Sequence, residues 1–505
     1  MDNPTKPTTD ATFVSKLSPA GMADPITGSD GVARSKHLVT LLLVTVILAN
    51  FGDGYCTMMM SVALPDIADR YGITLADANW VTIGFAITAA TIVMMTATIM
   101  QRIGLTKLFF WSRVFLIVGC LLGLFALNYP MMLVGRLLQG MAAGALFPIA
   151  NSVVIRVVPP AHSGAILSLN SAAFGLSVAV APLVSGLFLS YVSLRSIFLF
   201  PLVLAVATMI MGFAWVHNVE PRSYRKIDPL SVVLAAIGLA TLMYGFNELT
   251  DKPAIAIPLL VVGIALLVWF ARRQLHLPVP VLDLTPLRNH LYVTVDILLY
   301  MTGAMGQQAV LLLLPLYFER ARDFTEFVSG VLMLIVTLFY AVFDVYSGRI
   351  VDKHGMWPAV FSGFALMTAG LVGTILLSGT HLIWLIVIVA GLGVMGFALI
   401  NVPGKDVVLE RVPSDLLSHV NAAYSTSTQI ASSIGSALFV GILSADVVRL
   451  TARGISRSNA YVQGFQHSMW IAVAIEAVMT VVSLWYSRQM LKHHMARLGD
   501  KPVGV

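Results

Sequence analysis

The sequence predicts an all-α integral membrane protein with fourteen transmembrane helices. Of its 505 residues, 58% are hydrophobic and only 11% are charged. Its mean hydropathy is +0.86, and soluble domains carry about 25% charged residues. The apolar residues gather in runs of about 20 or more, long enough to cross a bilayer, without the alternation that marks strands. Because lipid offers no hydrogen bonds to the backbone, these runs must be helical.

The chain divides into two groups of six apolar runs with a further pair between them. Residues 1–37 are rich in Pro, Thr, Ser, Gly and Asp, which predicts a disordered tail, and no cleavable signal peptide is expected before His37. The N-terminal half, 38–217, holds runs near 38–62, 79–101, 105–127, 130–156, 164–190 and 195–217. A linker at 218–285 holds runs near 229–249 and 254–271. The C-terminal half, 286–490, holds runs near 290–317, 326–347, 357–378, 381–408, 416–444 and 467–488, before a tail at 491–505.

The loop charges predict the orientation in the membrane. The loops on the side of the N-terminus carry more than twice as many Lys and Arg residues as the loops on the other side. Such residues are retained in the cytoplasm, so both termini are expected to be cytoplasmic. The net charge of +6 is spread over these loops and does not form a nucleic-acid-binding patch.

One arginine lies inside the fourth apolar run. Arg136 belongs to the segment Gly135-Arg-Leu-Leu-Gln-Gly140, which continues to Gly144. A guanidinium there costs at least about 2.5–3.5 kcal/mol on insertion scales, so it needs a carboxylate, a carbonyl or water nearby. The alternative is an arginine that snorkels to the membrane surface. The glycines that follow favour a packed helix interface instead, because small residues let two backbones approach closely.

Motifs in the fourth and fifth runs resemble those of the major facilitator superfamily. Arg136, Gln139 and Gly140 resemble the fourth-helix motif of its proton-coupled exporters. Gly175, Pro182 and Gly186 resemble the fifth-helix motif of its antiporters, although Ala181 and Ser185, both small, replace two glycines of that pattern. The resemblance is to the fourteen-helix drug/proton antiporters. It implies two six-helix halves plus two inserted helices, with the fifth helix closely packed to seal the outer side.

A short loop pattern occurs once in each half. Gly348-Arg-Ile-Val-Asp-Lys-His-Gly355 resembles the superfamily's cytoplasmic-gate loop, and Ala97–Gly104 is a partial copy with Ala97 and Gln101 in place of Gly and Asp. The expected gate residues are Arg102, Gly104, Asp344, Gly348, Arg349, Asp352, Lys353 and Gly355. Repeats of this kind place the substrate site between the halves, near mid-membrane.

Acidic residues inside the runs are the candidate proton carriers. An acid in hydrocarbon tends to hold a proton and can release it when it meets water. Asp53 is the first candidate, one helical turn before Cys56, which occupies the position of the family's usual acid. It either replaces that acid or lies at another depth of the cavity. Asp296 is the second candidate, and Arg136 is expected to order the proton site. Arg113 is interpreted as a snorkelling helix-end residue, and Glu476 is given no role.

The function expected from these features is export of amphiphilic compounds in exchange for protons. The proton gradient drives it, and no cofactor or metal is needed. Lys107–Ser112 resembles members that work with a periplasmic adaptor and an outer-membrane channel, which places the protein in a bacterial inner membrane. An alternative is a dedicated exporter of one metabolite, such as a siderophore or fatty acid. A membrane enzyme or sensor is disfavoured, because there is no catalytic Ser/His/Asp set, no histidine cluster, no nucleotide loop and no sizeable soluble domain. Gly391–Gly396 mimics a dinucleotide fingerprint, but no strand precedes it.

Overall fold

The computed structural model of the chain describes residues 25–27, 33–218, 228–249, 252–277, 280, 282, 284–285, 291–354, 356–411 and 417–499. Within these residues, 14 helices are long and apolar enough to cross a membrane. The predicted number of spans and the all-α membrane class are therefore confirmed.

The helices follow the order expected from the apolar runs. The first six are α2 (Lys36–Met58), α5 (Trp80–Ile103), α6 (Leu105–Leu124), α7 (Tyr129–Val157), α8 (Pro160–Tyr191) and α9 (Leu199–Trp215). Three short elements connect them, namely α3 (Leu64–Tyr71), α4 (Leu75–Ala78) and η2 (Leu194–Phe198). The inserted pair is α10 (Pro229–Asn247) and α11 (Pro253–His276). The last six are α13 (Leu291–Leu316), extended by the π-helical turn η3 (Tyr317–Ala321), then α14 (Glu326–His354), α15 (Met356–Leu377), α16 (Ile383–Arg411), α17 (Leu417–Ala452) and α18 (Arg457–Gly499).

Local chemistry fixes several of the helix ends. The side chains of Asn128 and Asp228 accept hydrogen bonds from backbone amides in the first turns of α7 and α10, and proline occupies the first turn of both helices. Gly104 has a φ of 90°, which breaks the chain between α5 and α6 where most residues would be strained.

The predicted tails contain more regular structure than expected. Pro25–Thr27 (β1) pairs antiparallel with Ala33–Ser35 (β2), although residues 1–37 were expected to be disordered. At the other end, α18 continues to Gly499, into the segment that the sequence assigned to a tail. Backbone hydrogen bonding satisfies these polar segments locally, which composition alone does not predict.

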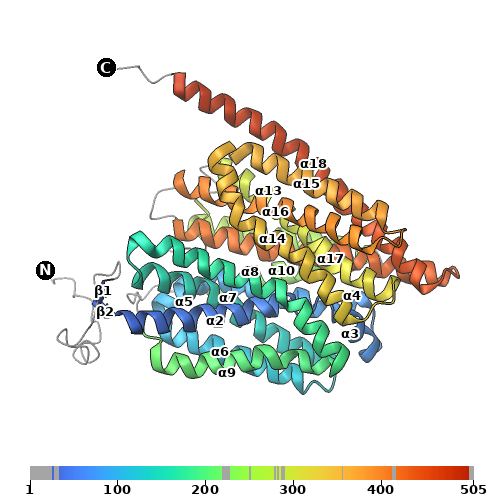
Figure 1. Cartoon of the computed structure of the whole chain (residues 1–505), viewed down its shortest axis with the longest axis horizontal. Coiled ribbons are helices and arrows are strands. Elements are labelled where there is room, and N and C mark those ends of the chain that lie inside the picture. The colour runs from blue at the N-terminus through green and yellow to red at the C-terminus, as the bar shows by residue number, and fades with distance from the viewer. Residues whose placement is uncertain are drawn as a thin grey trace.

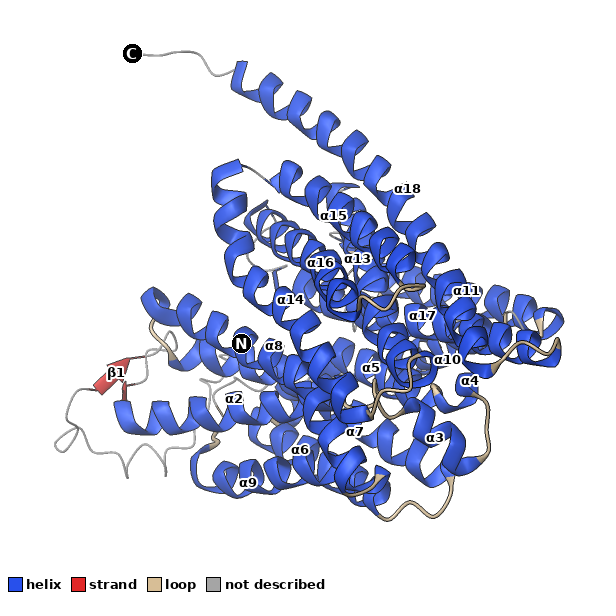
Figure 2. Ribbon diagram, turned by 45° about the vertical axis from the view of Figure 1, so that its right-hand side comes forward, coloured by secondary structure: helices blue, strands red, loops and turns tan. Residues whose placement is uncertain are grey.

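The two groups of six helices meet at one face of the molecule. We call the side on which α2 begins the N-terminal face and the side of α3 and α4 the distal face. Figure 1 shows α3 and α4 at the opposite end from the N-terminus. In Figure 2 the two halves lie side by side at the distal face and diverge toward the N-terminal face. The helix pairs α8–α14 and α5–α17 make the contact between halves, and α10 packs on both α5 and α17.

Small residues bring α7 against its neighbours. A Cβ added at Gly135 would lie 2.7 Å from the Gly119 carbonyl oxygen on α6. A Cβ at Gly140 would lie 2.2 Å from the Phe85 carbonyl oxygen on α5. Both distances are too short for any side chain, so these glycines are required for close backbone packing. This packing positions Arg136 in the interior.

Candidate functional site

A buried ion pair lies in the middle of the N-terminal half. The Nη2 atom of Arg113 on α6 is 2.6 Å from the Oδ2 atom of Asp53 on α2. Both side chains are 1% exposed. A buried pair of this kind has lost its water, and each charge depends on the other for compensation. Asp53 on α2 and Arg113 on α6 therefore compensate each other's charge.

The interpretation of Arg113 as a snorkelling residue is wrong. Its side chain is fully buried and points inward to Asp53, with its guanidinium 5.7 Å from the ring centre of Phe109. Its Nε donates to the hydroxyl of Ser112 at 3.4 Å. The long side chain reaches from the third span to the first, and an acid there offsets the cost of burying the charge.

Arg136 is also fully buried, but its partners are mostly carbonyls. Its Nε donates to the Val81 carbonyl at 3.0 Å, and its Nη1 donates to the Cys56 carbonyl at 3.0 Å. Nη1 also donates to Oε1 of Gln139 at 2.7 Å, and the guanidinium lies 4.4 Å from the Phe85 ring centre. Arg136 and Gln139 of the expected fourth-helix motif are therefore in direct contact. In this conformation the arginine that pairs with Asp53 is Arg113, not Arg136.

Three polar atoms of this N-terminal site keep no hydrogen-bond partner within the described residues. They are Oδ1 of Asp53, Nη1 of Arg113 and Nη2 of Arg136, all buried. A buried polar atom without a partner costs about 1–3 kcal/mol, and more when it is charged. Oδ1 of Asp53 is free to accept a hydrogen bond, and the two guanidinium nitrogens are free to donate one. Asp53 lies one turn from Cys56 on α2, and the Cys56 carbonyl accepts a hydrogen bond from Arg136. Arg113 and Arg136 therefore contact neighbouring turns of α2.

Asp296 lies in a different setting in the C-terminal half. The hydroxyl of Tyr424 on α17 donates to its carboxylate, and Asp296 is buried. Tyr424 packs edge-on against Tyr300, and Tyr300 stacks on Phe397 with ring centres 5.7 Å apart. Asp53 and Asp296 occupy the first helix of each half, but Asp296 has a tyrosine as its neighbour and Asp53 an arginine. The two candidate carriers are not chemically equivalent.

The fifth-helix motif lies at the contact between the halves. A Cβ added at Gly186 of α8 would be 2.3 Å from the carbonyl oxygen of Glu326 on α14. A Cβ at Gly330 would be 2.5 Å from the Pro182 carbonyl oxygen. Ser190 strengthens the contact, because its hydroxyl donates to Oε2 of Glu326 at 3.0 Å. The distal end of α8 is thus closed on α14.

Gly175 does not share this role. An added Cβ would meet nothing within 4 Å, so the expectation that Gly175 allows close packing is wrong in this conformation. Gly175 lies seven residues before Pro182, about two helical turns, at the middle of α8.

Further bonds join the halves at the distal face. Asn79 and Ser436 exchange two hydrogen bonds, with Nδ2 of Asn79 donating to the Ser436 carbonyl at 3.0 Å and the Ser436 hydroxyl donating to Oδ1 of Asn79 at 2.9 Å. Arg320 lies 2.5 Å from Asp69 and 3.8 Å from Asp66, so η3 is tied to α3. The distal face is closed by both backbone packing and charge.

Asp66 gives this closure a dependence on pH. It lies outside the spans, and burial raises its pKa to about 6, helped by the nearby carboxylates of Glu326 and Asp69 and opposed by Arg320. Because this carboxyl takes up a proton as the contact forms, its favourable contribution is complete below the ordinary value of 3.8 and is lost as the pH rises through about 6. We expect the distal contact to be tighter near pH 5 than near pH 7.

This expectation can be checked by alkylating an engineered cysteine at Ser190 across that pH range. Rates must be corrected for thiol ionisation with an exposed reference cysteine. The Asp66→Asn variant mimics the protonated acid, so its corrected rate should stay low and nearly constant. An unchanged pH profile in that variant would show that Asp66 is not the source of the pH dependence.

The structure describes part of the expected cytoplasmic gate. Arg102 is exposed at the end of α5, and Gly104 ends that helix. Oδ1 of Asp344 accepts a hydrogen bond from Nδ2 of Asn401 on α16 at 3.2 Å. The backbone of Gly348, Arg349, Asp352 and Lys353 continues α14, but the side chains of the last three, and Gly355 altogether, lie outside the described residues.

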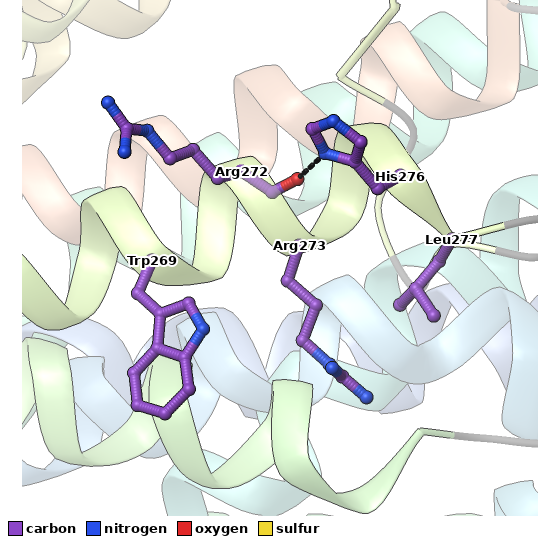
Figure 3. Close-up of a pocket in the computed structure, with 5 residues that line it drawn as sticks. All are labelled: Trp269, Arg272, Arg273, His276 and Leu277. Atoms are coloured by element: carbon purple, nitrogen blue, oxygen red, sulfur yellow. Dashed lines mark hydrogen bonds between the residues drawn. The ribbon is translucent and has the colours of Figure 1, made fainter.

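A surface pocket occurs away from these sites. It lies at the N-terminal-face end of α11 and is lined by Trp269, Arg272, Arg273, His276 and Leu277 (Figure 3). All five residues come from one helix end. Arg273 is held by two hydrogen bonds to Asp228, at 2.7 and 3.1 Å. Since α11 alone lines it, this pocket is not the site between the halves.

Sequence reasoning placed the charges in the membrane but missed one pairing. Arg113 was visible only as a charge in an apolar run, 60 positions from Asp53. The signal available in the sequence was the number of basic and acidic residues within the apolar runs of this half. A second buried arginine in a half with one intramembrane acid indicates that the acid has two possible partners.

Comparisons with known proteins agree with this architecture. The sequence model of the Major Facilitator Superfamily matches residues 46–436. The lincomycin resistance protein LmrB of Bacillus subtilis (strain 168) is 25% identical over 473 residues, covering 91% of this chain and 98% of LmrB. The riboflavin transporter RibZ of Clostridioides difficile (strain 630) is 20% identical over 460 residues, covering 90% of this chain and 98% of RibZ. The crystal structure of an auto-inhibited POT family peptide transporter aligns with a TM-score of 0.65 at 14% identity, over 88% of this chain and 96% of that one.

Proposed function

Because this chain belongs to the Major Facilitator Superfamily, we propose that it exports amphiphilic drugs or other toxic compounds in exchange for protons. The protein is a multi-pass membrane transporter and not an enzyme. Substrate, coupling ion and direction of transport are the proposed parts. The observation that best supports proton coupling is the buried pair of Asp53 and Arg113.

The pair provides a chemical basis for proton exchange. When Asp53 is ionised, Arg113 compensates its charge at 2.6 Å. A proton on Asp53 removes that compensation and leaves a buried guanidinium in need of new partners. Protonation therefore favours a rearrangement of α6 against α2. A substrate that releases the proton reverses it.

The distal closure supports alternating access. The halves are closed at the distal face by Gly186, Ser190 and the Asn79–Ser436 bonds. Reversing this arrangement exposes the site to the other side. With cytoplasmic termini, as the loop charges predict, the conformation described faces inward and is ready to take substrate from the cytoplasm. Reporter fusions after His217 and after Arg273 should both be cytoplasmic.

The substrate class rests on the relatives. LmrB is named for resistance to lincomycin, which supports export of a toxic compound. RibZ is named a riboflavin transporter, which favours the second candidate, a dedicated carrier of one metabolite. The two candidates differ in breadth. A multidrug exporter protects cells against several unrelated compounds, whereas a dedicated carrier protects against or moves only one.

The proposed cellular setting is a bacterial inner membrane. The resemblance of Lys107–Ser112 to adaptor-dependent members supports a periplasmic adaptor and an outer-membrane channel as partners. The LmrB relatives come from Bacillus and Listeria, which have no outer membrane, so an adaptor is not general among relatives. Co-purification from membranes of the native host tests it. Recovery without any periplasmic protein would remove the adaptor from the proposal.

The decisive experiment measures transport and protons together. Purified protein in liposomes is tested with lincomycin, riboflavin and ethidium, and proton release on substrate binding is followed with a pH-sensitive dye. Asp53→Asn keeps the size and removes the titration, so it should bind substrate, release fewer protons and fail to concentrate substrate against a gradient. Normal release in Asp53→Asn together with loss in Asp296→Asn would move the carrier to the second half.

A further inference from the structure

A second intramembrane carboxyl lies far from the Asp53 site in a different chemical setting. Glu476 is in the last span, α18, and its side chain is fully buried. Neither carboxylate oxygen makes a hydrogen bond of acceptable geometry within the described residues. No lysine, arginine or histidine is within salt-bridge distance in those residues. Asp53, by contrast, has Arg113 beside it.

The carboxyl group is enclosed by three helices. Oε1 of Glu476 lies beside Gly306 on α13, and a Cβ added at Gly306 would be 2.3 Å from this oxygen. The sulfur of Met367 on α15 is 2.8 Å from the same Cβ position. The backbone of Gly306 is the polar group beside the acid. Gly306 thus leaves the space that the carboxyl occupies, and a Cβ there would displace the carboxyl.

The charged groups of the packed helices lie elsewhere. Helix α15 contains no Asp, Glu, Lys, Arg or His. On α13 the one charged residue is Asp296, ten positions from Gly306 and so about 15 Å along the helix. Asp446 of α17 is bonded to Arg449 and His467, and η3 carries Glu319 and Arg320 at the distal end. None of these offers Glu476 a compensating charge in this packing.

We propose that Glu476 is a proton-binding site of the C-terminal half, protonated in this conformation and ionised only when α18 separates from α13 and α15. An ionised carboxylate buried without a partner costs several kcal/mol, so the closed packing and the proton favour each other. By linkage, a change that separates the helices lowers the affinity for the proton. The proton is the only species transferred, and water receives it.

Hydroxyl groups mark a route from the carboxyl toward the N-terminal face. Thr480, one turn further along α18, faces Thr368 on α15 with their hydroxyl oxygens 3.2 Å apart. Ser483 follows on the same helix and donates to the Thr480 carbonyl at 2.8 Å. The α15–α18 contact therefore becomes more polar toward the N-terminal face. Water entering there when the helices part can reach Glu476.

This inference rests on the proposed proton exchange, and two measurements distinguish a failure of the Glu476 site from a failure of the exchange itself. The first is the infrared carboxyl band of purified protein at neutral pH, which Glu476→Gln should remove and Glu248→Gln should leave. The second is proton release on binding lincomycin or riboflavin, which Glu476→Gln should reduce while its melting temperature stays near wild type. Glu476→Asp, which keeps the acid, should restore part of the release.

The outcomes are distinct. An unchanged carboxyl band in Glu476→Gln shows that Glu476 holds no proton and overturns the inference. Wild-type release in that variant, with the band lost, shows a permanently protonated packing residue and also overturns it. If the wild-type protein itself releases no protons with any probe, the proposed exchange fails, while the band still reports whether Glu476 is protonated.

Discussion

Replacing Arg113 with Gln should abolish proton-driven accumulation of substrate and destabilise the protein by about 3–5 kcal/mol. The reason is that the change leaves the Asp53 carboxylate, which is only 1% exposed, without its cationic partner. Loss of one member of a buried pair costs more than the pair itself contributes, because the remaining charge keeps its desolvation penalty. The measurements are thermal unfolding in detergent and gradient-driven uptake in liposomes.

The double variant Asp53→Asn/Arg113→Gln separates stability from function. It removes both charges, so it should recover most of the lost stability, as expected when two contacting residues are energetically coupled. It should not recover coupling, since no titrating group remains at the site. Arg272→Gln is the matched control, because Arg272 is exposed and its loss leaves no buried acid. Additive effects of the two single changes on stability would show that the pair does not couple.

Replacing Gly186 with Leu should open the distal face and strongly reduce transport. A Cβ alone would lie 2.3 Å from the Glu326 carbonyl oxygen and 2.9 Å from its carbon, and both belong to backbone that cannot swing aside. Overpacking typically costs about 1–3 kcal/mol. The two states of a transporter differ by a few kcal/mol, so this cost is enough to move the population.

A cysteine at Ser190 reports on this change. Ser190 lies at the contact with Glu326, and the two native cysteines are buried, which keeps background labelling low. Labelling from the distal side should be faster in Gly186→Leu than in wild type. Gly175→Leu is the matched control on the same helix, because an added Cβ there meets nothing within 4 Å. Equal labelling rates in the two leucine variants would contradict the assignment of the seal to Gly186.

The sequence alone determined the membrane class, the number of spans and the burial of certain charges. These follow from local properties, since an apolar run long enough to span lipid must be a helix. The need for small residues near Arg136 also followed from the sequence, and Gly140 meets it by contacting the Phe85 carbonyl. Each of these features depends on the hydropathy of a single stretch of chain, so no knowledge of distant contacts is needed to predict it.

Only the tertiary structure decided which charges face each other. Asp53 has Arg113 as its partner because α6 turns that side chain inward, and helix rotation is set by packing among several helices. Packing among several helices also explains why Gly186 contacts the backbone of α14 and Gly175 does not, although both belong to one motif. Glu476 was visible as an acid in a span, but its isolation depends on Gly306 and Met367, which lie more than 100 positions away. Charge pairing is a long-range property that periodicity and composition do not encode.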